Sequence, residues 1–228
     1  MGNSRIDILK MDPVKYKLNL LTRQECGGPE RTAQEWARDF KQVATINTGM
    51  FMQDQRSCGY MKNFKVVINS HVSVSNTILA FNPIDGSVPP VQIIDRQCQD
   101  WGDLQYRYEC YDQSIRMVDC NQVNCWKDMD KRWSVACIGI DKSGNVLFIF
   151  CRSPYKMHDF IDILLKAPIE LYNLMYLEGG PPASFYLNSG NREVSGIGSY
   201  ESDVCETDEN SVFWNVPNVI GIEKIEGI

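Results

Sequence analysis

The chain has 228 residues, of which 43% are hydrophobic and 23% charged, proportions typical of ordinary globular proteins. Its formal net charge of −6 argues against a general nucleic-acid-binding surface. No apolar run approaches the ~18 residues that a membrane-spanning helix needs. We therefore expect a single domain over residues 1–228, with its core at about 5–225, no nucleic-acid partner and no membrane span. The oligomeric state is left open.

Nine cysteines are many for a cytosolic chain of this length, and none form a CxxC pair. This argues against a zinc ribbon and against a cysteine-dependent redox protein. Cys137 and Cys151 lie in apolar, strand-like surroundings and are expected to be buried small hydrophobes. Disulfides are expected among the other seven, namely Cys26, Cys58, Cys98, Cys110, Cys120, Cys125 and Cys205.

The cysteine usage also favours an oxidising compartment, although residues 1–9 contain no signal peptide. We expect a periplasmic or secreted protein whose leader is not part of this sequence. A cytoplasmic location is less favoured.

The first third of the chain predicts three elements. Residues 5–21 alternate between apolar and polar side chains on either side of Asp12, which predicts an opening hairpin. Thr32, followed by Glu35 three residues later, predicts a capped helix. Residues 43–46 predict a short buried strand.

That strand leads into Asn47, Thr48 and Gly49. An Asn side chain both donates and accepts hydrogen bonds, which suits a sugar hydroxyl or a phosphate oxygen. The alternative is an Asn that caps its own turn. We keep all three residues as substrate-binding candidates.

Residues 95–113 are polar and aromatic, and we expect a long irregular insertion there. Its aromatic side chains could stack on sugars or pack in a core. Gln113 begins an extended segment in which Arg116 has apolar neighbours. An arginine in this setting needs an anionic partner, either a structural carboxylate or a bound phosphate. Gln113 and Arg116 are therefore substrate-binding candidates.

Residues 134–152 predict a second hairpin, and residues 157–165 predict a helix that ends before Pro168. Four polar residues lie at the transition between them, where backbone N–H groups are available to an anion. Arg152 and Ser153 could bind substrate, whereas His158 near Asp159 could act as acid or base. The alternative is an ion-paired histidine at a helix start.

Residues 174–187 read LMYLEGGPPASFYL, in which a strand-like segment delivers Glu178 to Gly179 and Gly180. The glycines allow close approach of the backbone to a ligand, and a buried carboxylate must be paired or used. The alternative is a tight turn with Glu178 facing water. Ser184 follows the turn and is a further substrate-binding candidate. The acidic residues 201–209 are expected to form a solvated loop.

Three segments in this order resemble the phosphodiester glycosidase family, and the resemblance spans most of the chain. They are VATINTGMF at 43–51, SVACIGIDKSGNVLFIFCRSPYKMHDFIDILL at 134–165 and MYLEGGPPASFYL at 175–187. The matching positions are Asn47, Gly49 and Phe51, then Gly139, Asp141 and Gly144, and finally Glu178, Gly179 and Gly180. Glu replaces the usual Asp, and Pro-Pro replaces the frequent Gly/Ser, as in a bacterial-type branch.

The resemblance implies an α+β fold, with one domain of mixed, largely antiparallel sheet and a few packed helices. It also implies hydrolysis of a sugar-1-phosphodiester, here on an envelope or extracellular glycan. The expected catalytic residues are Glu178 as acid/base or oxocarbenium stabiliser, with Asp159 or His158 as its counterpart. Arg116 and Arg152 would neutralise the phosphate.

This chemistry requires no cofactor or metal, although the clustered acids leave a divalent cation open. The alternative function is a non-catalytic carbohydrate- or polymer-binding domain on the same scaffold.

Overall fold

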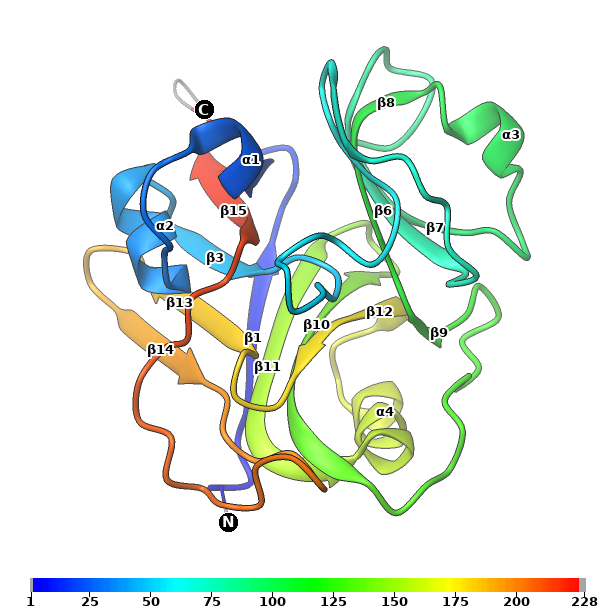
Figure 1. Cartoon of the computed structure of the whole chain (residues 1–228). Helices are drawn as coiled ribbons and strands as arrows, with labels where there is room; N and C mark the ends of the chain where they lie inside the picture. Colours follow the sequence, from blue (N-terminus) through cyan, green and yellow to red (C-terminus); the bar gives the residue numbers. More distant parts are fainter. Residues whose placement is uncertain (1, 226–228) are drawn as a thin grey trace.

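The computed structural model describes residues 2–225, which form three five-stranded antiparallel sheets (Figure 1). The first has the order β1-β11-β10-β12-β9, with bounds Ile6–Met11, Val146–Lys156, Arg132–Asp141, Leu171–Gly179 and Arg116–Val118. The second is β14-β13-β3-β15-β2, with bounds Glu193–Ile197, Ser184–Asn188, Ala44–Asn47, Asn218–Lys224 and Tyr16–Thr22. The third is β5-β4-β8-β6-β7, with bounds Val66–Asn69, Met61–Asn63, Tyr108–Ser114, Thr77–Pro83 and Val91–Asp95.

The helices are short and lie outside the sheets (Figure 1). They are α1 (Arg23–Cys26), α2 (Ala33–Asp39), α3 (Trp101–Leu104) and α4 (Met157–Lys166). The predicted α+β class, with largely antiparallel sheet and few helices, is confirmed. In the part of the chain that the structure covers, no helix is both long and apolar enough to cross a membrane.

One apolar cluster joins the three sheets. It contains Leu18 of β2, Phe81 of β6 and Phe148 of β11, all at most 1% exposed. The sheets therefore share one core and fold together as one domain. A second cluster covers the other face of the first sheet, where Phe160 of α4 packs against Cys137 and Ile149.

Local sequence signals predict several elements correctly. Thr32 and Glu35 form the expected capping box of α2. The second hairpin is present as β10 and β11, and Asp141 accepts main-chain N–H bonds within its turn. Helix α4 ends at Lys166, shortly before Pro168.

The predicted opening hairpin is wrong. Both of its strands exist, but β1 pairs with β11 in the first sheet and β2 pairs with β15 in the second. The alternating pattern marks strands that bury one face, and it carries no information about which strand lies alongside. Here, strands from late in the chain provide the partners.

The prediction of an irregular insertion at 95–113 is also wrong, because this segment contains α3 and most of strand β8. Trp101, Tyr108 and Tyr111 form a packed cluster, in which the Trp101 and Tyr111 ring centroids are 5.5 Å apart at 89°, whereas Tyr106 is exposed. Of the two uses considered for these aromatic residues, core packing is the one found.

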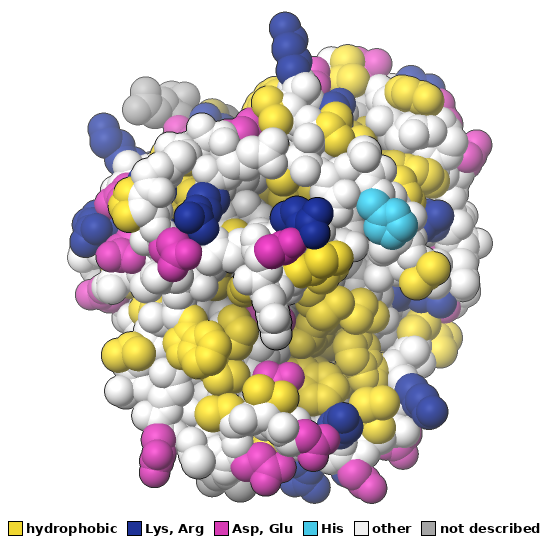
Figure 2. All heavy atoms as spheres, viewed as in Figure 1, with side chains coloured by type: hydrophobic (Ala, Val, Ile, Leu, Met, Phe, Trp, Pro, Cys, Tyr) yellow, Lys and Arg dark blue, Asp and Glu magenta, His cyan; other side chains and the backbone are white. Residues whose placement is uncertain are grey.

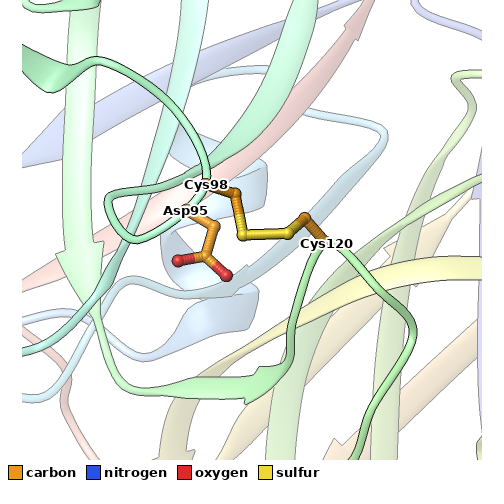
Figure 3. A group of neighbouring side chains, drawn as sticks. All are labelled: Asp95, Cys98 and Cys120. Carbon is orange, nitrogen blue, oxygen red and sulfur yellow. A yellow bond between two sulfur atoms is a disulfide. The ribbon is translucent and has the colours of Figure 1, made fainter.

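One disulfide is present, between Cys98 and Cys120 (Figure 3). It joins the segment after β7 to the segment after β9. Cys137 and Cys151 are fully buried in the second cluster, as predicted. The other five cysteines of the described chain are thiols.

Candidate functional site

A β-bulge near the end of β12 sets the direction of Glu178. Residue Ala136 of β10 is opposite Glu178, whereas the next residue, Cys137, is opposite Tyr176. Leu177 is therefore the extra residue on β12. A bulge bends its strand and changes the direction of the neighbouring side chain, which is why bulges are frequent beside functional sites.

The Glu178 carboxyl group is held by main-chain donors. Its Oε1 accepts a hydrogen bond of 3.0 Å from the N–H of Gly179, and the N–H of Phe51 also bonds to the carboxylate. Burial nevertheless raises the pKa of Glu178 to about 7, and the negative charge of Glu201 adds to this effect. A carboxyl group with this pKa is half protonated near neutral pH and can donate a proton.

Glu201 is a site residue that the sequence did not reveal, because it belongs to a run that reads as solvated loop. Burial raises its pKa, while the charge of Lys131 lowers it. Gly180 has a φ of +65°, and a Cβ atom there would lie 3.0 Å from the Cβ of Glu201. Glycine at this position thus allows the second carboxyl group to approach the turn.

Asn47 supports the turn after Glu178. Its Nδ2 donates to the carbonyl oxygen of Pro182 at 3.1 Å, and its Oδ1 accepts the N–H of Ser184 at 2.6 Å. The hydroxyl of Ser184 donates to the same Pro182 oxygen, and Thr48 is buried with its hydroxyl on the Gly49 carbonyl. In the structure these side chains bond to the protein itself, and their expected contact with substrate stays a prediction.

Asp112 supports the loop that provides Phe51. It is fully buried on β8, and its Oδ2 accepts the N–H of Gly49 at 2.8 Å. Its Oδ1 and the nearby Ser114 hydroxyl have no hydrogen-bond partner among the described residues. Burial raises the pKa of Asp112 to about 7.

Aromatic side chains form an apolar wall near Glu178. The ring of Trp126 lies 5.4 Å from that of Tyr176 and 6.2 Å from that of Trp133. A Cβ atom on Gly179 would lie 2.6 Å from the Trp133 ring, so only glycine fits between strand and wall. Figure 2 shows a hollow with apolar side chains near the middle of the face drawn in Figure 1.

The proposed phosphate role of Arg116 requires correction, because its partner is a structural carboxylate. Its Nη1 lies 3.1 Å from both Oδ atoms of Asp95, and the two side chains are only 15% and 2% exposed. Gln113 is similarly occupied, since it bonds to main-chain atoms of Tyr60, Ser73 and Ser75.

We expect Arg116→Met to lower the free energy of unfolding by about 3 kcal/mol, because it leaves the Asp95 carboxylate buried without its cation. The double variant with Asp95→Asn should recover part of this loss. Urea unfolding of the wild type, the two single variants and the double variant measures the coupling free energy between Arg116 and Asp95. A loss of affinity for substrate with stability unchanged would contradict the structural role.

Arg152 and Ser153 also bond to the chain itself, and their expected role as anion ligands stays a prediction. The Arg152 guanidinium donates to the carbonyl oxygens of Ile197, Asp208 and Asn210 at 2.8–2.9 Å and pairs with the Asp208 carboxylate. It thereby fixes the segment that carries Glu201. The Ser153 hydroxyl accepts the N–H groups of Asn3 and Ser4.

His158 and Asp159 lie in the first turn of α4, and within the described residues neither forms a hydrogen bond or an ion pair with Glu178. The carbonyl oxygen of His158 accepts a hydrogen bond from Asn124. Asp159 is exposed, and its charge acts on Lys156. The carboxyl group whose charge acts on Glu178 is that of Glu201, and a catalytic role of His158 or Asp159 stays a prediction.

Asp95, Cys98 and Cys120 form one cluster of potential metal ligands, with ligand atoms within 4.8 Å of one another (Figure 3). Both sulfur atoms are joined in the disulfide, and the carboxylate binds Arg116. Without thiolates, and with its one carboxylate paired, this cluster does not fit a resident metal ion.

A comparison with known protein families identifies the family of this chain. The profile of the phosphodiester glycosidase family matches residues 40–223, which include Asn47, Glu178 and Glu201. The chain belongs to this family. The resemblance noted from three short segments is thus confirmed over most of the sequence. No curated protein matches the chain significantly.

Solved structures share the fold of this phosphodiester glycosidase family member. The catalytic domain of zebrafish N-acetylglucosamine-1-phosphodiester α-N-acetylglucosaminidase, auto-inhibited by its pro-peptide, has a TM-score of 0.66 at 13% identity, over 97% of this chain and 83% of its own. A hypothetical protein from Synechocystis has a TM-score of 0.65 at 12% identity, over 95% and 58%. A Burkholderia pseudomallei protein whose name describes it as exported has a TM-score of 0.53 at 10% identity, over 95% and 73%.

Proposed function

We propose that this protein hydrolyses a sugar-1-phosphodiester of an envelope or extracellular glycan, with Glu178 as the general acid. The observation that carries the proposal is the state of Glu178, a buried carboxyl group whose pKa lies near 7 and which is close to the charge of a second carboxyl group, that of Glu201. Membership of the phosphodiester glycosidase family supports the substrate class. The name of the Burkholderia relative supports an exported location.

In the proposed reaction, the bond between the anomeric carbon and the phosphate oxygen breaks, and its electron pair remains on the phosphate. Glu178 donates its proton to that oxygen, and a water oxygen bonds to the anomeric carbon. We assign the ionised role to Glu201, which stabilises positive charge on the sugar and accepts a proton from the water. The products are the free sugar and a phosphomonoester.

A panel of sugar-1-phosphodiesters tests this proposal. We expect free sugar and phosphomonoester in equal amounts from at least one member, with and without a metal chelator. Binding without either product would support the alternative, a non-catalytic carbohydrate-binding domain. Product formation that stops with the chelator would show that a cation takes part.

A further inference from the structure

A cavity of about 550 Å³ lies between the loop after β3 and the segment at β5. Cys58 connects this cavity with Glu178. It lines the cavity, and its N–H donates to the carbonyl oxygen of Met50 at 2.9 Å, next to Phe51, whose own N–H bonds to the Glu178 carboxylate. We call this space the Arg56 cavity, after the arginine in its wall.

The charge of the side chains that line the Arg56 cavity is opposite in sign to the net charge of the whole chain. It includes Arg56 and His71 but no Asp or Glu, whereas the chain carries a formal charge of −6. Apolar side chains complete the wall, among them Met52 and Ile68. A cavity of this size with a few polar groups is typical of a small-ligand site, and the charge favours an anion.

Arg56 can exchange its present partner for a ligand. Its Nε lies 2.7 Å from Oδ2 of Asp54, but the side chains of this pair are 76% and 50% exposed. An exposed ion pair contributes little free energy, so a bound phosphate can compete for the guanidinium. This is the opposite of Arg116 and Arg152, which are held by buried or multiple partners.

The cavity adjoins a second hollow of about 370 Å³, which shares Arg56, Ser57 and Ile68 with it and adds Arg23. The two spaces together form a groove whose only acidic residue, within the described chain, is Asp54. A group larger than phosphate therefore has room to extend along it.

We propose that the Arg56 cavity binds the phosphate of the substrate and the start of the group attached to it, with Arg56 and His71 as the anion ligands. The placement of the sugar at the Glu178 carboxyl group rests on the proposed function. Anion binding in the cavity does not, and it can be measured without turnover.

The binding test uses dimethyl phosphate, a diester anion, and proton NMR of the imidazoles. The chain has two histidines, so a His71→Gln variant assigns both resonances. We expect the His71 resonance to shift saturably while that of His158 does not, and Arg56→Gln to weaken binding about tenfold. Arg38→Gln, which removes a similarly exposed arginine paired with Asp39, should leave it unchanged.

An equal shift with sodium chloride at the same ionic strength, or an unchanged affinity in Arg56→Gln, would overturn the inference. Kinetics provide the second readout. Arg56→Gln should raise KM about tenfold for a phosphodiester but not for a neutral aryl glycoside of the same sugar. If no substrate is hydrolysed but dimethyl phosphate binds at His71, the proposed function fails and the anion site stands.

Discussion

Replacing Glu178 with Gln is expected to lower turnover at least about 100-fold, the smaller effect of removing a general acid. The amide oxygen still accepts the N–H of Gly179, so the fold is retained. Turnover of the wild type should fall as pH rises through about 7, because only the protonated carboxyl group donates. Initial rates over a pH series measure both effects.

The matched control is Glu209→Gln, which neutralises an exposed acid on the same segment as Glu201. It should retain wild-type turnover and the same pH profile. Stability gives an independent check, because burial raises the pKa of Glu178 in the folded state. Glu178→Gln should therefore be more stable than the wild type at pH 8. Normal turnover in this variant would remove Glu178 from catalysis.

Replacing Asp112 with Asn is expected to remove a large part of the pH dependence of stability. The folded state raises the pKa of Asp112 from 3.8 to about 7, so it binds a proton that the unfolded chain has released. The contribution of Asp112 to stability is therefore fully present below about pH 4 and is lost as the pH rises through about 7. The loss is on the order of 4 kcal/mol.

Urea unfolding at pH 5 and pH 8 measures this difference. Asp112→Asn should be more stable than the wild type at pH 8, because it has no buried carboxyl group to ionise. Its amide oxygen still accepts the N–H of Gly49. Asp112→Ala is the contrasting variant, since it leaves that buried N–H unpaired and costs about 2 kcal/mol. The same pH slope in the wild type and Asp112→Asn would show that Asp112 is ionised throughout. Glu178→Gln in both backgrounds separates the contribution of Glu178.

Elements defined by neighbouring residues could be predicted from the sequence. The capping box at Thr32 and Glu35 and the hairpin around Asp141 are local hydrogen-bond patterns, and the structure contains both. The partners of distant groups could not be predicted. Arg116 needed an anion, but nothing in its segment identified Asp95, which lies on another strand.

Glu201 shows the same limit within the site. Its segment is acidic and lacks an apolar pattern, so it reads as a solvated loop. Arg152 donates to the carbonyl oxygens of Ile197, Asp208 and Asn210, on both sides of Glu201, and the Glu201 side chain lies against Gly180. No feature of residues 201–209 alone indicates this contact.

The sequence by itself determined an antiparallel α+β protein in which Glu178 ends a strand before two glycines. Periodicity and turn chemistry act over a few residues, so they are visible in the chain. Only the tertiary structure decided that Glu178 is protonatable near neutral pH and that its neighbour is Glu201. The pKa of a carboxyl group depends on its burial and on nearby charges, and residues from distant segments determine both.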